Sequence, residues 1–250
     1  MAGHSKWKQI KHYKAATDKK RGALFTKLIR EITVAAKAGG GDPGGNARLR
    51  TAIDAAKANS MPKDNIERAI KKGTGELEGE TYTEVTYEGY GPAGVAIIVD
   101  AVTDNPTRTV ADVRHKMSRS GGNLGTPGSV AFMFEKKGQI EVDASQYPDE
   151  DATLEAALEA GAEDFRRDDD VYVVSTDPAS FHAVQAALVA KGITPTESEL
   201  AMVPRNTVPV TGDAVAQLFK LIEALEDLDD VQKVWANFEV DDAELEKLED

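Results

Sequence analysis

The sequence predicts an α+β multidomain fold, in which a basic helical bundle precedes two α/β units. Three observations predict it. The charge divides near residue 72, with 17 lysines and arginines against 6 acidic residues before that point and 13 against 37 after it. The spacing of apolar residues changes from a helical to a strand period at about residue 81. From Gly138 onward the expected elements follow the β-α-β-β-α-β order of a ferredoxin-like unit.

Three short amphipathic helices are expected in the basic region. The first spans residues 22–38 and has its apolar residues on one stripe. Asn46 is a good N-cap for a second helix that runs to about Ala58. A third helix is expected at residues 62–72 and is closed by Gly73. Small apolar faces of this kind can cover one another, which predicts a compact bundle.

A linker and a pair of strands follow the bundle. Residues 74–80 are rich in glycine and glutamate and poor in apolar side chains, which indicates a linker. Two paired strands are expected at Tyr82–Tyr90 and Ala93–Val102, around the turn Gly91-Pro92. Because the second strand is nearly all apolar, it is expected at the centre of its sheet.

A helix and a further strand are expected next. Thr107 or Thr109 can cap the helix, which runs to about Ser120 before a pair of glycines. The apolar run Val130–Phe134 then predicts a strand.

The ferredoxin-like unit is expected to alternate strands and helices to about residue 203. Its strands are predicted at 139–142, 163–166, 171–176 and 194–203, and its helices at 152–160 and 178–191. The run Asp168-Asp169-Asp170 is interpreted as a polar turn between two strands rather than as a metal site.

The last elements repeat the β-α-β order. A strand near 206–210, a helix at 213–225 and a strand at 231–238 are expected, followed by an acidic tail. These elements can complete the first sheet, which would leave the ferredoxin-like unit as an insertion within it.

The first 21 residues have the composition of a nucleic-acid-contacting arm. Seven of them are lysine or arginine, and only Asp18 opposes them. Trp7 and Tyr13 are interleaved with the lysines. Cations neutralise phosphates and flat rings stack on bases, so the two together favour a nucleic-acid partner. For Trp7, packing of the arm onto the bundle is an equally good interpretation.

We expect the nucleic-acid contacts to come from the arm, the bundle and one helix of the first α/β unit. The candidate residues are the aromatic, histidine and cationic side chains of the arm and the cations that follow it: His4, Lys6, Trp7, Lys8, Lys11, His12, Tyr13, Lys14, Lys19, Lys20, Arg21, Lys27, Arg48, Arg50, Lys63, Arg68, Lys71, Lys72, Arg108 and Arg114. An ordinary solvated face is the competing interpretation for the cations at 107–120.

No catalytic motif is found in the sequence. The chain has no cysteine, and its four histidines show no metal-binding spacing. A Walker A loop, a dinucleotide fingerprint and a nucleophile elbow are all missing from the sequence. We therefore expect no enzyme activity, no cofactor, no metal and no small-molecule substrate. With no apolar run near the ~18–20 residues that span a bilayer, we also expect a cytoplasmic protein without a membrane partner.

Several long segments resemble the YebC family. They are the runs AGHSKW, KRGALFTKLIREI, SMPKDNIERAIKKG, YEGYGPAGVAIIV, RTVADVR and GGNLGTPGSVAFMFEKKG, which lie in order between Ala2 and Gly138. The resemblance continues more loosely to the C-terminus. The family includes a mitochondrial activator of cytochrome oxidase subunit translation.

The resemblance implies three domains: the helical bundle and two α/β (ferredoxin-like) domains, of which the last is inserted in the middle one. Together with the residue patterns it predicts a basic arm at 1–21, a bundle at 22–73, a linker at 74–80, a discontinuous domain at 81–136 and 205–240, an inserted domain at 137–204 and an acidic tail at 241–250.

Three functions remain open at this point. The family label implies a probable transcriptional regulator that binds DNA. Other members of the family imply a translation factor that binds ribosomal RNA at the ribosome and relieves stalling on proline-rich stretches. The third is an acidic scaffold whose body binds protein. Regulation of gene expression through nucleic-acid binding is common to the first two, and it is the function that we expect.

Overall fold

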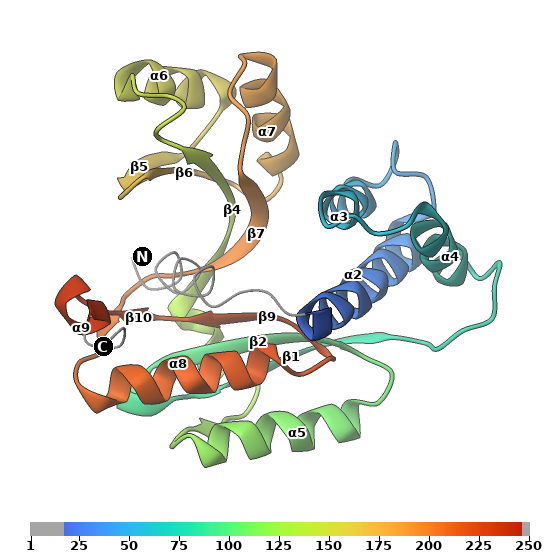
Figure 1. The fold of residues 1–250 in the computed structure, drawn as a ribbon, viewed down its shortest axis with the longest axis vertical. Coiled ribbons are helices and arrows are strands. Elements are labelled where there is room, and N and C mark those ends of the chain that lie inside the picture. Colours follow the sequence, from blue (N-terminus) through green and yellow to red (C-terminus); the bar gives the residue numbers. More distant parts are fainter. Residues whose placement is uncertain (1–17, 247–250) are drawn as a thin grey trace.

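The fold is given by a computed structural model that describes residues 18–246. It is an α+β multidomain fold in which a helical bundle lies beside two four-stranded sheets (Figure 1). The bundle consists of α2 (Asp18–Gly39), α3 (Ala47–Ala58) and α4 (Lys63–Thr74). No helix within this part of the chain is long and apolar enough to cross a membrane.

The bundle is held together by an apolar core and by one close contact at a glycine. Ile32, Leu49 and Ala56 are fully buried at its centre. Gly73 lies inside α4 and does not close it as predicted, because α4 continues to Thr74 and the left-handed Gly75 follows it. A Cβ on Gly73 would lie 2.4 Å from the Thr33 carbonyl oxygen of α2. Gly73 therefore serves close packing between two helices.

The N-cap prediction for α3 is confirmed. The side chain of Asn46 accepts a hydrogen bond from the amide of Leu49 at 3.0 Å. Its amide group also donates to the carbonyl oxygens of Ala35 and Gly40. Asn46 thereby joins the start of α3 to the end of α2 across the glycine-rich loop.

The first sheet has the order β3-β1-β2-β9 and is antiparallel throughout. Its strands are β1 (Thr83–Tyr90), β2 (Ala96–Thr103), β3 (Asn123–Leu124) and β9 (Val231–Ala236), and a 3-10 turn at Pro92–Gly94 joins the first two. As predicted, β2 lies inside the sheet and is almost completely buried. The expected strand at 231–238 thus joins this sheet as β9, whereas the expected strand near 206–210 does not, because it pairs with residues 238–239 in a separate two-stranded sheet.

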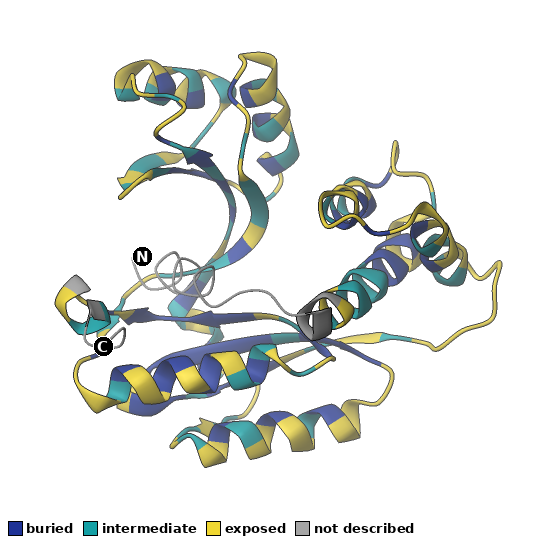
Figure 2. Cartoon of the chain, viewed as in Figure 1, coloured by how far each residue is buried: buried dark blue, intermediate teal, exposed yellow. Residues whose placement is uncertain are grey.

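Two helices cover one face of the first sheet, and their buried sides face the strands (Figure 2). They are α5 (Pro106–Arg119) and α8 (Asp213–Glu226). The predicted cap of α5 was wrong: Asn105 caps the helix by accepting from the amide of Arg108, and Pro106 occupies its first turn. Thr109 is instead buried within the helix and bonded to Asp230.

The opposite face of the first sheet packs against the start of the second sheet. The shared core contains Ile98, Val130, Phe134 and Trp235. The predicted strand at Val130–Phe134 was wrong, because Ala131–Met133 form a 3-10 turn and β4 (Phe134–Asp143) begins only at Phe134. An apolar run does not have to be a strand: it can also form an irregular segment whose alternate residues are buried in a core.

The second sheet has the order β5-β6-β4-β7 with antiparallel neighbours, which confirms the ferredoxin-like pattern. The remaining strands are β5 (Asp164–Asp168), β6 (Val171–Thr176) and β7 (Glu197–Pro204), and the helices are α6 (Glu150–Ala160) and α7 (Phe181–Ala190). Both helices lie on one side of this sheet (Figure 1). The polar turn is confirmed at Asp169, which has a positive φ of 53°.

Short elements complete the chain. A two-stranded sheet pairs β8 (Val208–Pro209) with β10 (Phe238–Glu239), and α9 (Asp242–Glu246) follows.

Candidate nucleic-acid interface

The inner side of α2 is fixed to the first α/β unit by buried charges. Arg30 pairs with Asp230, between α8 and β9, at 2.8 Å, and only 12% and 8% of the two side chains are exposed. The Arg30 guanidinium also donates to the carbonyl oxygen of Asp229 and lies 5.6 Å from the ring centre of Tyr82. We use the name seam for the contacts that Arg30, Arg48, Arg108 and Lys27 make with Asp230, Glu31, Glu84 and Glu226.

Asp230 is the centre of the seam. Its carboxylate accepts hydrogen bonds from Arg108 at 2.8 Å, from the Thr109 hydroxyl at 2.6 Å and from the Thr103 hydroxyl at 3.2 Å. Burial alone would raise the pKa of Asp230, but these bonds and the charge of Arg30 outweigh it and lower the pKa. The carboxylate is therefore held ionised between two arginines.

Two more predicted contact residues belong to the seam. Arg48 pairs with Glu31 at 2.7 Å and with Glu84 at 2.6 Å, and so links the bundle to β1. Lys27 donates to the carbonyl oxygen of Glu226 at the end of α8. The structure thus gives Lys27, Arg48 and Arg108 an intramolecular role, and a phosphate would have to compete with these partners.

The outer side of α4 has a different character. Lys63, Arg68 and Lys71 are all exposed on α4, and Arg68 and Lys71 lie on the side of the helix away from its buried Ile66 and Ala69. Lys63 is 87% exposed and is paired only loosely with Glu67, at 3.3 Å. Exposed pairs of this kind hold their cation weakly, so the charges are accessible to phosphate. We call these three residues the outer cations.

Two further lysines lie at helix ends. Lys37 is in the last turn of α2 and Lys72 in the last turn of α4, where a positive charge complements the helix dipole. Both line a groove between the bundle and the linker, together with Leu77 and Tyr82. Their position has a structural explanation as well as a functional one.

The other predicted cations of the described chain are spread out. Arg50 is exposed on α3 and donates to the carbonyl oxygen of Pro43 at 3.3 Å. Arg114 is exposed on α5, a helix that covers the first sheet on the side away from the second sheet (Figure 1). The structure therefore does not bring all the predicted residues together in one site.

The predicted arm contacts lie outside what the structure describes. His4, Lys6, Trp7, Lys8, Lys11, His12, Tyr13 and Lys14 precede the described chain, and only the helical backbone is described for Lys19, Lys20 and Arg21. Their role stays a prediction.

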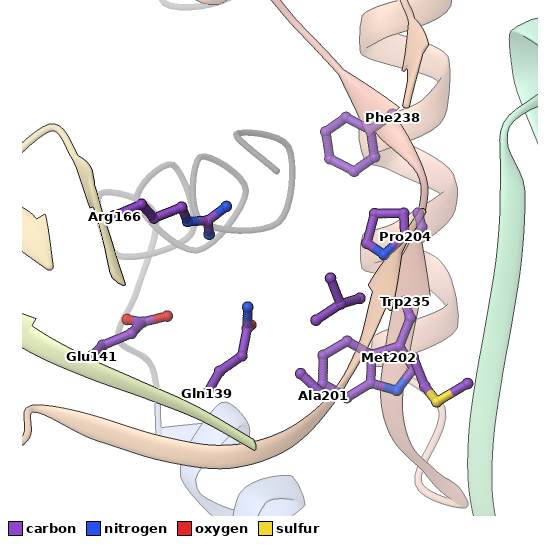
Figure 3. A pocket seen from close by; sticks show the side chains of 10 residues that line it. Gln139, Glu141, Arg166, Ala201, Met202, Pro204, Trp235 and Phe238 are labelled. Carbon is purple, nitrogen blue, oxygen red and sulfur yellow. The ribbon is translucent and has the colours of Figure 1, made fainter. Parts of the chain in front are cut away.

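A small recess lies where the second sheet meets β9. Gln139 and Glu141 of β4 and Arg166 of β5 point into it from one side, and Trp235 closes the other (Figure 3). Its volume is about 20 Å³, enough for about one water molecule. Within residues 18–246 no group of three or more acidic or histidine side chains could hold a metal ion.

Sequence reasoning missed the residues that organise this surface. Neither Arg30 nor Asp230 was among the residues predicted to form the site. Their pairing joins positions 200 residues apart, so no local pattern indicates it. Phe132 was placed inside a strand, whereas it is 67% exposed on the 3-10 turn.

Both regions of the chain match models of one family. Residues 5–76 match the TACO1/YebC protein N-terminal domain, and residues 82–238 match the TACO1/YebC second and third domain. A protein of Gemmatimonas aurantiaca named "Probable transcriptional regulatory protein" is 67% identical over 97% of this chain and 98% of its own length. One of the same name from Syntrophotalea carbinolica is 58% identical over 99% of both chains.

A solved structure shares the fold. The crystal structure of a conserved hypothetical protein from Aquifex aeolicus is 49% identical and superposes with a TM-score of 0.82, over 89% of this chain and 92% of that one. The models and the relatives agree over nearly the whole length, and the chain belongs to the TACO1/YebC family.

Proposed function

We propose that this protein is a non-catalytic, nucleic-acid-binding regulator of gene expression that acts in transcription, in the cytoplasm and without a cofactor. The observation that carries the proposal is the accessibility of the outer cations, Lys63, Arg68 and Lys71, on a unit whose remaining arginines are largely paired. The names of the relatives support a role in transcription.

The charge distribution supports binding through the bundle end. Residues after 72 carry a net charge of −24, which repels phosphate. A polyanion that approaches the molecule is therefore directed to the basic region. We include the arm in the interface, together with Arg50, Lys37 and Lys72. We also propose the division of the chain into the six regions predicted above, one of which is discontinuous.

The seam supports the proposal in a second way. Lys27, Arg30 and Arg48 hold the bundle on the first α/β unit, and α4 packs on α2, so the outer cations are presented by a fixed helix rather than by a loose one. A cation on a fixed helix loses less backbone conformational entropy on binding than a cation on a mobile segment.

The experiment measures the affinity of the full chain for a 20-base-pair DNA duplex and for a 12-nucleotide single-stranded RNA. The test variant is Lys63→Gln/Arg68→Gln/Lys71→Gln. Its matched control, Arg167→Gln/Lys191→Gln/Lys220→Gln, removes the same charge from the acidic part of the chain. At about 100 mM salt we expect the test variant to bind at least roughly tenfold more weakly and the control to bind like the wild type. Equal affinities for both variants would overturn the proposal.

A second candidate function is a translation factor that binds ribosomal RNA. The exposed ring of Phe132 favours it, since unpaired bases stack on such rings. Sedimentation of the full chain with intact ribosomes, lost when residues 2–17 are deleted, would favour this candidate over transcription. A discrete footprint on duplex DNA without ribosome association would favour transcription.

A further inference from the structure

The most exposed large apolar side chain of the described residues is Phe132, on the 3-10 turn Ala131–Met133. Its exposure is 67%, against 38–54% for Leu24, Leu77, Leu158, Val189 and Leu200. Single exposed apolar residues are common on protein surfaces. At Phe132, however, the surrounding structure holds the ring in its exposed position.

The turn is fixed by a buried carboxylate. Glu88 of β1 is 8% exposed, and its two carboxylate oxygens accept hydrogen bonds from the amides of Gly128, Val130 and Ala131 at 2.7–2.8 Å. Burial alone would raise the pKa of Glu88, but the three amide donors outweigh it and lower the pKa. The anchor therefore stays charged at neutral pH.

The residues around the ring prevent it from turning inward. Val130 and Phe134 are 0% and 4% exposed in the core between the two sheets, and Met133 packs against the same core. With these neighbours inside, the backbone directs Phe132 outward. Turning it inward would withdraw at least one of them, at a cost of the order of a large core truncation.

A cation lies next to the turn. The amide of Arg205, just after β7, donates to the carbonyl oxygen of Met133 at 2.8 Å. The Arg205 side chain is 57% exposed, and its ion pair with Glu135 is long, at 3.7 Å. The guanidinium is therefore accessible to an anion that can compete with this weak pair.

We propose that Phe132 is a stacking platform for an unpaired nucleotide base and that Arg205 contacts the phosphate beside it. A fixed, exposed ring combined with an accessible guanidinium on a segment bonded to the same turn is suited to bind single-stranded nucleic acid. A duplex keeps its bases stacked on one another, so it gains little from this site. The inference rests on the proposed function and adds to it a second contact, specific for single strands.

The test compares Phe132→Ala with Phe132→Trp in the full chain, with a 12-nucleotide oligouridylate as the single-stranded probe and the 20-base-pair duplex as the second probe. Loss of one base stack predicts a roughly 5- to 150-fold weaker affinity of Phe132→Ala for the single strand. Phe132→Trp should keep or increase the wild-type affinity, since it keeps a stacking ring. Duplex affinity should not change in either variant.

Two further variants separate stacking from charge. Leu158→Ala, which removes another exposed apolar side chain, should bind like the wild type. Arg205→Gln should lower the salt dependence of single-strand binding by about 0.7 in logarithmic slope, whereas Phe132→Ala should leave the slope unchanged.

The outcomes distinguish this inference from the proposed function. If the wild type binds the probes and Phe132→Ala binds them equally well, the inference is wrong, the ring serves another partner such as a protein, and the proposed function stands. If the wild type binds neither probe, the proposed function fails.

Discussion

The seam and the outer side of α4 use the same residue types for opposite purposes. Arg30, Arg48 and Arg108 are paired with carboxylates at 2.6–2.8 Å where the bundle meets the first α/β unit, whereas Lys63, Arg68 and Lys71 are exposed to solvent on α4 of the bundle. In the sequence both groups are basic residues on amphipathic helices. The difference shows that basic residues of similar appearance in the sequence have two roles. Some hold the molecule together through ion pairs, and others remain accessible to phosphate.

The largest effect is expected from breaking the seam at its centre. Asp230→Ala would leave Arg30 nearly buried without its carboxylate, at a cost of about 3 kcal/mol in the free energy of unfolding. Urea denaturation of the full chain measures it. Asp104→Asn removes an exposed carboxylate that also pairs with Arg108 and should leave the unfolding midpoint close to that of the wild type. Equal midpoints for the two variants would show that the seam does not hold the bundle.

A second change moves α4 without touching any charge. Gly73→Ala places a methyl group against the Thr33 carbonyl oxygen and the Ala36 methyl group, and should cost about 1–3 kcal/mol. Gly22→Ala, where nothing lies within 4 Å of the new methyl group, should instead stabilise α2 by about 0.5–1 kcal/mol. Thermal unfolding of both variants checks the opposite signs.

Acid should weaken the seam. The pKa of Asp230 is lower in the folded protein than its ordinary value of about 3.9, so its contribution to stability is complete above that value and is lost as the pH falls through the folded pKa. The unfolding free energy should therefore fall as the pH drops below the ordinary carboxyl range of about 4. Asp230→Asn should be less stable at neutral pH and should show a shallower fall, and an unchanged slope would contradict the assignment.

The sequence pattern predicted the structure correctly where interactions between residues close in the sequence determine it. Asn46 has a side chain that satisfies a free helix amide, and it caps α3 as predicted. The apolar run of β2 is central because both of its faces are covered. The ferredoxin-like order follows from the alternation of periods along the chain.

The predictions were wrong where a contact between residues far apart in the sequence determines the local structure. Thr109 has the chemistry of a cap, but its hydroxyl bonds to Asp230 and Asn105 takes the cap. Gly73 looked like a helix stop, and only the close approach of α2 explains it. The site was harder still, since sequence cannot show that Arg48 and Arg108 are paired while Arg68 is exposed.

A smaller effect on stability is expected from the exposed edge of the seam. Arg48→Gln removes the link between Glu31 and Glu84, in which the Arg48 side chain is 41% exposed, so solvent screening limits the cost to about 1 kcal/mol or less. Guanidinium denaturation measures it. A cost near that of Asp230→Ala would mean that Arg48, and not Asp230, is the main link.

The salt dependence of nucleic-acid binding tests the comparison most directly. It is measured for two double variants that remove the same charge, Arg68→Gln/Lys71→Gln from the outer side of α4 and Arg48→Gln/Arg108→Gln from the seam, with thermal unfolding to confirm that both are folded. We predict that the outer variant lowers the logarithmic slope for duplex DNA by about 2, because each phosphate contact contributes about 0.9, and that the seam variant keeps the wild-type slope. A lower slope in the seam variant with an unchanged slope in the outer variant would contradict the division of charge proposed for this protein.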